Sequence, residues 1–304
     1  MLNDELLTPC PMRGAGVFNQ SGDKQRMIIT KRDTEILRIC LEQKFLLLRQ
    51  IARKFFPKSR SLYKVPARRV NLLMKHGYLR AVKPRVGHET LYLTTPRGLK
   101  HLKGQELSNG LRVVENVDLK TYDHDVWVTD VRIIMEQAPF DWASERILRK
   151  QAERCKVPDG MLTSADHHSF LVEIERTLKN KHYYERMFLN NWRHYKNKEG
   201  TLFLVARQTM IPWFKKLTRC DDNFYFATIY DLLDRGTDTD FSNKNNETIM
   251  PYESWGYNPG DPAECDKEFL EEHEECPGSA EEDGLERLMN GGAVSDPSET
   301  HGPG

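Results

Sequence analysis

Hydrophobic residues recur at every third or fourth position between residues 30 and 76, which is the spacing of helices with one apolar face. The pattern predicts three helices in this stretch. Asp33 is placed to cap the first helix, Pro57 ends the second, and the third extends over about 64–76. The first part of the chain is therefore expected to be helical.

The third predicted helix and the residues after it have a basic, polar surface. A strand, a turn containing Gly87 and a second strand follow the helix, and Thr95 is placed to start a short fourth helix. Three helices and a hairpin are the order of a winged helix-turn-helix, in which the third helix enters the major groove. An ordinary solvated face is the other interpretation of these charges. The residues predicted to contact DNA are Lys64, Arg68, Asn71 and Lys75 on one helix face, Arg69 beside it, and Lys83 and Arg85 in the turn.

Strand and helix patterns are mixed in the second part of the chain, which indicates an α/β or α+β domain. Residues 104–118 form a linker or a first strand in this interpretation. The predicted elements are helix 124–137, strands 142–150, 157–164 and 170–175, helix 179–197, strand 201–207, helix 211–217 and strand 223–230.

The charge distribution changes the picture that the net charge gives. The 304 residues include 45 basic and 45 acidic residues, so the formal net charge is zero. Residues 24–103, however, hold 21 basic and four acidic residues, and residues 234–304 hold four basic and 19 acidic residues. The first imbalance indicates a partner with a phosphate backbone, and the second is typical of a disordered tail. We expect a flexible leader at 1–26, a winged-helix DNA-binding domain at 27–104, a second domain at 105–233 and an acidic disordered tail at 234–304.

The sequence also predicts a location. There is no run of about 18 apolar residues that would span a membrane, and the first residues lack the pattern of a secretory signal. The six cysteines are scattered without a CxxC pair, as expected for reduced thiols in a cytoplasm. We therefore expect a cytoplasmic protein.

Three carboxylates are expected to gather on neighbouring strands of the second domain. Asp159 starts one predicted strand, and Glu173 and Glu175 alternate on the next, so both should point to the same side of the sheet. Clustered carboxylates repel one another unless a cation lies between them, and hard oxygen ligands favour Mg²⁺ or Mn²⁺. Lys179 lies four residues after Glu175 and would stabilise charge on a phosphate. This set fits metal-dependent phosphodiester hydrolysis; an exposed strand with alternating glutamates is the alternative.

Three further residues are candidates for the same site. Glu145 could supply an additional carboxylate from the preceding strand, although a surface position explains it equally simply. Tyr183 lies one helical turn after Lys179, and Arg186 follows on the same face. Together they could follow a DNA strand by charge and stacking.

The segments VPDG at 157–160 and VEIE at 172–175 carry a family resemblance. They resemble the PD-(D/E)xK motif of restriction-endonuclease-like nucleases, with Glu175 where a lysine is usual. The segments TKRDTEILRIC, ARRVNLLMKHGYLR, HDVWVTDVRI and VEIERTLKNKHYY resemble replication-relaxation proteins, and the resemblance extends over residues 27–230. This family looks like the MobC type of plasmid mobilisation relaxase.

The resemblance implies a fold and an activity. The fold would be a winged helix followed by a restriction-endonuclease-like domain with the element order αβββαβ. The activity would be a site- and strand-specific nick in supercoiled plasmid DNA at an origin of transfer, with a coupling or accessory mobilisation protein as a further partner. By this resemblance Asp159, Glu173 and Glu175 would be metal ligands and Lys179 the catalytic cation. A non-catalytic winged-helix replication initiator or transcriptional regulator remains the alternative.

Overall fold

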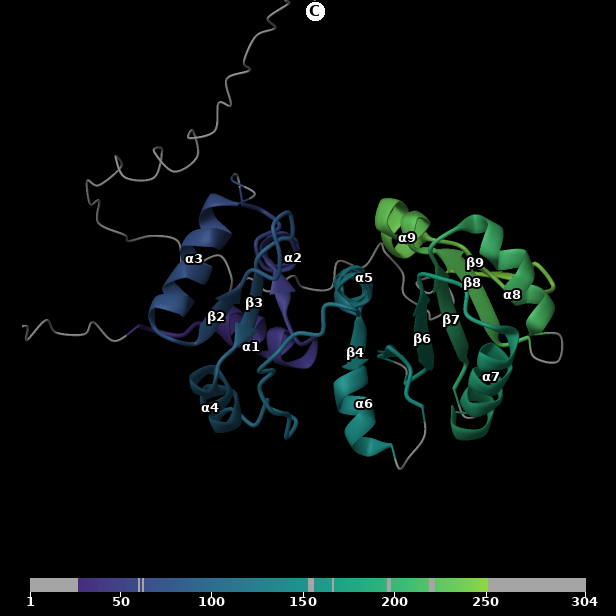
Figure 1. The fold of residues 1–304 in the computed structure, drawn as a ribbon, viewed down its shortest axis with the longest axis horizontal. Helices are drawn as coiled ribbons and strands as arrows, with labels where there is room; N and C mark the ends of the chain where they lie inside the picture. Colours follow the sequence, from purple (N-terminus) through teal and green to yellow (C-terminus); the bar gives the residue numbers. More distant parts are fainter. Residues whose placement is uncertain are drawn as a thin grey trace, which may run out of the picture. The chain divides into compact units, whose positions relative to one another are not determined.

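A computed structural model describes residues 27–250, apart from 60, 62, 153–155, 166, 196–197 and 219–221. The predicted leader, and the part of the predicted tail from residue 251 onwards, therefore lie outside the described residues. The described chain is mixed α/β, and all of it belongs to one compact unit, residues 1–257 (Figure 1).

The first half of this unit consists of four helices and a small sheet. Thr30 caps the first helix, because its hydroxyl accepts a hydrogen bond from the Asp33 amide. The Asp33 carboxylate in turn accepts a hydrogen bond from the Thr30 amide. Asp33, the expected cap, is therefore the second member of a capping box. The three short strands are antiparallel, in the order β1-β3-β2. The elements are α1 (Lys31–Glu42), β1 (Leu46–Leu47), α2 (Leu48–Phe55), α3 (Lys64–Lys75), β2 (Leu79–Val82), β3 (Leu91–Thr94) and α4 (Pro96–Gly104).

The second half is built on a seven-stranded sheet. Strands β4, β5 and β6 form an antiparallel meander, β7 and β8 continue parallel to β6, and two short strands extend the edge. The elements are α5 (Tyr122–Met135), β4 (Phe140–Ser144), α6 (Glu145–Gln151), β5 (Gly160–Ser164), β6 (Ser169–Glu175), α7 (Lys181–Tyr195), β7 (Gly200–Val205), α8 (Ile211–Leu217), β8 (Phe224–Thr228), α9 (Ile229–Arg235), β9 (Phe241–Ser242) and β10 (Thr248–Ile249), with 3₁₀ turns at 208–210 and 236–238.

Both faces of the large sheet are covered by helices. One apolar cluster joins α5 and α9 to side chains such as Val172 and Ile174 of β6. A second cluster, rich in phenylalanine, joins α7 and α8 to Phe203 and Phe226. Figure 1 shows these helices on either side of the strands. Because successive residues of a strand alternate between faces, Glu173 and Glu175 point to the α7 side, as the sequence predicts.

Two expectations about this half are wrong. The strand expected at 142–150 extends over Phe140–Ser144 instead, and α6, of which Leu148 is the buried residue, follows it at Glu145–Gln151. The chain does not lose its regular structure at residue 233 either. Thr228 caps α9 by accepting from the Asp231 amide at 3.0 Å, and Phe241 is fully buried in the core. The described part of the expected tail, 234–250, thus belongs to the sheet domain.

The two halves meet at α5. Phe45, Leu47 and Leu91 of the first half pack with Tyr122 and Val126, the residues that begin α5. Several ion pairs cross the same junction: Glu42–Arg132, Lys54–Glu136, Arg49–Asp130 and Lys44–Asp125, at 2.7–2.9 Å. Residues 105–121 contain no helix or strand, which agrees with a linker. The junction is therefore both apolar and charged.

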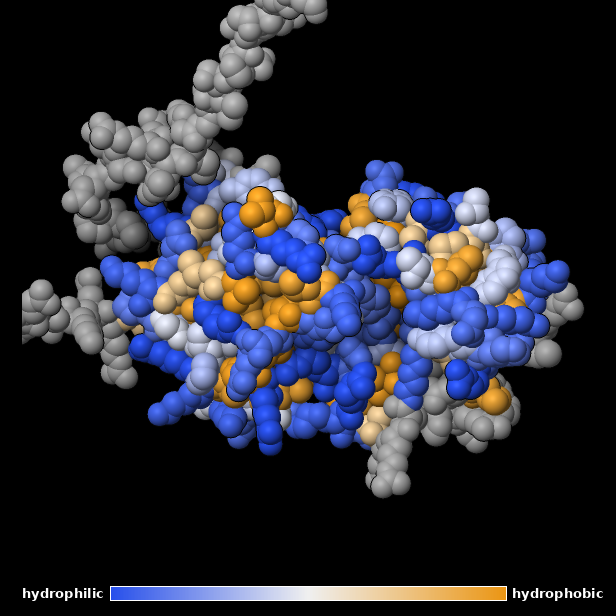
Figure 2. Space-filling model, in the orientation of Figure 1, coloured by the Kyte–Doolittle hydropathy of each residue, from blue (hydrophilic) through white to orange (hydrophobic). Residues whose placement is uncertain are grey.

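The surface is largely polar. The face in Figure 2 is mainly hydrophilic, with hydrophobic residues visible between the elements of both halves. Among the described residues, no helix is long and apolar enough to cross a membrane.

Candidate functional site

The predicted DNA-contacting residues of α3 lie on one exposed helix face. Lys64, Arg68, Asn71 and Lys75 are all exposed, whereas Val70 on the opposite side is fully buried. The predicted turn residues Lys83 and Arg85 are exposed in the connection between β2 and β3, and Arg186 is exposed on α7. The helix and the connection thus present free basic groups that could meet phosphates.

Arg69 does not belong to this face. Its guanidinium group pairs with the fully buried carboxylate of Asp33 and also donates to the Ile28 carbonyl at 3.1 Å. Burial would raise the pKa of Asp33, but hydrogen bonds from Arg69 and Thr30 outweigh burial and lower it. Arg69 therefore fixes α3 against the start of α1, and its DNA contact stays a prediction.

The three predicted site carboxylates lie at neighbouring positions of β5 and β6. Gly160 pairs with Val172 across the strands, so Asp159 lies beside Glu173 at the point where the two strands separate. Glu173 and Glu175 are only 5% and 6% exposed. Buried carboxylates need a counter-charge, and the structure provides a different one for each residue.

Lysines neutralise the two glutamates. Lys179 Nζ lies 2.8 Å from Glu175 Oε2, and Lys156 Nζ lies 3.5 Å from Glu173 Oε2. Burial by itself lowers the pKa of each ammonium group, but the neighbouring glutamate outweighs it and the pKa is raised in both cases. Both lysines are therefore firmly cationic. The sequence places Lys179 four residues after Glu175 but predicts a phosphate as its partner, and it does not predict Lys156 as part of the site.

Tyr183 connects the two ammonium groups. Its ring centroid lies 4.5 Å from Lys179 Nζ and 5.2 Å from Lys156 Nζ, both within the range of cation–π attraction. Its ring also packs edge-on against Tyr184, which is fully buried. Tyr183, the candidate accessory residue, thus lies between two cations beside Glu173 and Glu175.

Asp159 has partners on two other elements. Its Oδ2 accepts a hydrogen bond from the Ile174 amide at 2.8 Å and lies 3.1 Å from His124 Nε2, on the first turn of α5. Burial lowers the pKa of His124, but Asp125 and Asp159 outweigh burial and raise that pKa to about 10. The imidazole is therefore a cation at neutral pH. The local sequence pattern does not predict this pairing, because His124 and Asp159 lie 35 positions apart.

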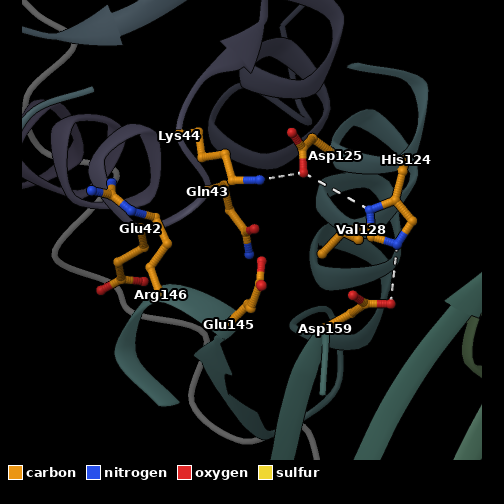
Figure 3. A pocket seen from close by; sticks show the side chains of 9 residues that line it. All are labelled: Glu42, Gln43, Lys44, His124, Asp125, Val128, Glu145, Arg146 and Asp159. Atoms are coloured by element: carbon orange, nitrogen blue, oxygen red, sulfur yellow. Dashed lines mark hydrogen bonds and ion pairs between the residues drawn. The ribbon is translucent and has the colours of Figure 1, made fainter. Parts of the chain in front are cut away.

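Asp159 and His124 line a small pocket at the junction of the halves (Figure 3). Glu145 also lines it, but from the first turn of α6; its amide donates to the Asp159 carbonyl at 3.2 Å and its carboxylate pairs with Arg149. The side chain of Gln43 points into the pocket, and its buried Nε2 has no hydrogen-bond partner among the described residues. The first half therefore contributes polar groups beside Asp159.

The predicted metal site does not fit this arrangement. The described part of the chain contains no group of three or more His, Cys, Asp or Glu side chains arranged to hold one metal ion. Asp159, Glu173 and Glu175 are instead paired separately with His124, Lys156 and Lys179. The donors that Mg²⁺ or Mn²⁺ would need are thus already bound to cationic side chains.

Comparisons with protein-family models, with curated proteins and with solved structures find no match for this chain. Its function has to be argued from the site itself.

Proposed function

We propose that this protein binds double-stranded plasmid DNA through its first half and nicks one strand at the carboxylate and lysine groups of β6 and of the segments that lead into β5 and α7. The observation that carries the proposal is the pair of buried glutamates in the second half, Glu173 and Glu175, which lie beside Asp159 and pair with the partly exposed lysines Lys156 and Lys179. Such groups are costly to bury, and they concentrate at sites of chemistry. By resemblance, the reaction would be relaxase nicking at an origin of transfer.

The arrangement of elements supports the same proposal. A helix, three antiparallel strands, a helix and a parallel strand follow one another as α5, β4, β5, β6, α7 and β7, with α6 inserted after β4. This is the αβββαβ order expected of a restriction-endonuclease-like domain. The three helices and small sheet of the first half are likewise in the order expected of a winged helix.

The lysines and carboxylates have complementary parts in such a reaction. The ammonium groups of Lys156 and Lys179 would bind phosphate oxygens and offset the charge that develops on them. A carboxylate released by its lysine would accept a proton from the attacking water. Because the carboxylates are not gathered around a common centre, the proposal assigns no step to a metal ion.

The alternative is a DNA-binding initiator or regulator that does not cut. One observation favours it: the close glutamate–lysine pairs neutralise the buried charges and could serve the fold alone. The two functions differ in whether one strand of the bound DNA is cut.

The test is relaxation of a negatively supercoiled plasmid that carries the DNA flanking the coding region of this chain. We expect Asp159→Asn and Glu173→Gln to slow relaxation by about 100-fold or more, because each removes a charge without changing shape. Glu185→Gln, an exposed carboxylate on α7, is the matched control and should relax DNA like the wild type. The assay is run with Mg²⁺, with Mn²⁺ and with a chelator.

DNA affinity is measured in parallel. Loss of relaxation with retained binding supports the cutting function. A wild-type protein that binds tightly but leaves the supercoil intact under all three conditions contradicts cutting and supports the alternative.

A second prediction concerns the exposed face of α3. The double substitution Lys64→Ala/Arg68→Ala should weaken DNA binding roughly tenfold and reduce the salt slope of the affinity by about 2, because two phosphate contacts are lost. Lys100→Ala/Lys103→Ala, which removes two exposed cations from α4, is the control. Titrations at several salt concentrations decide the matter; equal effects of the two double variants would show that α3 is not the DNA-binding helix.

A further inference from the structure

Four charged side chains form a continuous line from the first half of the molecule to Asp159 (Figure 3). Lys44 Nζ lies 2.7 Å from Asp125 Oδ1, and the same oxygen lies 3.8 Å from His124 Nδ1. On the other side of the imidazole ring, Nε2 lies 3.1 Å from Asp159 Oδ2. The charges alternate along the line: ammonium, carboxylate, imidazolium, carboxylate.

His124 restricts the orientation of Asp159. The Asp159 side chain is 16% exposed, and its Oδ2 is held both by the Ile174 amide of β6 and by His124 of α5. Two partners on separate elements remove most of the rotamer freedom of a short side chain. Without the imidazole, the Ile174 amide would be the remaining hydrogen-bond donor to the Asp159 carboxylate within the described part of the chain.

Lys44 in turn restricts His124. Asp125 also accepts from the Thr121 hydroxyl at 2.9 Å, so its carboxylate is held on both sides. If Lys44 were absent, Asp125 would have one cation left and would draw the imidazolium toward itself, away from Asp159. The attraction between opposite unit charges at such a separation is strong enough near a protein surface to move a side chain.

The backbone conformation of Lys44 indicates that the fold holds this side chain in a defined position. Lys44 has φ of 75°, in the left-handed region that residues other than glycine rarely adopt. The turn between α1 and β1 therefore accepts a strained conformation and places the ammonium group at Asp125. Lys54, which also forms an ion pair with α5, contacts Glu136 near the far end of that helix and does not lead to Asp159.

We infer that His124 is a positioning residue for Asp159 and that Lys44, acting through Asp125, makes the geometry of the site depend on the docked first half. This inference rests on the proposed function, since Asp159 is the group that is positioned. Its consequence is that a rearrangement of the first half on DNA would be transmitted to the site through Lys44.

The test uses full-length Lys44→Met, His124→Ala and His124→Gln, with Lys54→Met as the matched control. Two quantities are measured: the relaxation rate at saturating DNA, and the hydrogen-exchange rate of the Ile174 amide. We expect His124→Ala to slow relaxation by about 100-fold and Lys44→Met by about tenfold, with DNA affinity unchanged. His124→Gln, which keeps a donor near the Nε2 position, should recover part of the rate. Lys54→Met should relax DNA like the wild type.

The exchange measurement does not depend on cutting. The Ile174 amide should exchange faster in His124→Ala and Lys44→Met, relative to neighbouring amides of β6, and unchanged in Lys54→Met. If the wild type does not relax DNA, cutting fails while the exchange rates still decide whether Asp159 is positioned in this way. Unchanged Ile174 exchange in His124→Ala, or equal acceleration in Lys44→Met and Lys54→Met, would overturn the inference.

Discussion

Glu42→Leu should lower the free energy of unfolding by about 3 kcal/mol, because it removes a partner from a completely buried cation. The Arg132 side chain is 0% exposed and that of Glu42 is 1% exposed, and Arg132 Nη1 lies 2.7 Å from Glu42 Oε2. After the substitution Glu136, at 2.9 Å from Nε, would be the one carboxylate among the described residues left to balance the guanidinium group. An uncompensated charge at the junction should therefore favour unfolding.

The double variant Glu42→Leu/Arg132→Met separates this cause from a simple loss of packing. Replacing both members of a buried ion pair by apolar residues is often close to neutral, so the double variant should be more stable than Glu42→Leu alone. Glu35→Leu is the control, since Glu35 contacts Arg38 on the same helix but is 39% exposed; it should cost at most about 1 kcal/mol. Denaturant unfolding measures all three. A double variant less stable than Glu42→Leu contradicts the explanation.

Gly160→Ala should destabilise the second half by about 3 kcal/mol through overpacking. A Cβ at this position would lie 2.1 Å from Cζ2 of Trp142, the residue that packs across β4 and β5. Trp142 is 5% exposed within the main core cluster, so its ring cannot move away cheaply. The glycine of the VPDG segment is thus required by sheet packing, whatever the chemistry of Asp159.

Gly104→Ala is the matched control for this prediction. Gly104 ends α4, and a Cβ there would have no heavy atom within 4 Å. Alanine is the better helix former, so this change should leave stability equal or raise it by up to about 1 kcal/mol. Thermal unfolding followed by circular dichroism measures both variants; equal stability of Gly160→Ala and the wild type would show that Trp142 can repack.

The spacing of apolar residues correctly predicts the positions of the elements that have one long apolar face. The third helix was expected at 64–76 and is found at Lys64–Lys75, and its expected polar face is exposed. The strand expected at 170–175 is β6, with its two glutamates on one side. These features depend on near neighbours in the chain, which the local pattern describes well.

Short segments were harder to assign. Residues 145–151 contain a single buried position, so the pattern of apolar residues does not distinguish a helix from a strand there. The sequence pattern also predicts the end of the folded chain too early, at residue 233, whereas β9 and β10 follow it. Phe241 is an isolated apolar residue in a polar sequence, and only its contact with the core on α9 and β8 makes it part of the sheet domain.

The sequence by itself determined which charged residues this protein has, which helix carries an exposed basic face, and that Glu173 and Glu175 lie on one side of a strand. Only the tertiary structure decided which charges pair over long distances. Lys156 reaches Glu173, His124 reaches Asp159 and Lys44 reaches Asp125 because a strand separation, a helix start and a strained turn bring them together. The physical reason is that a buried charge needs an opposite charge close to it in space, and the fold decides which residue lies there. The number of residues between two charges in the chain therefore does not indicate whether they pair.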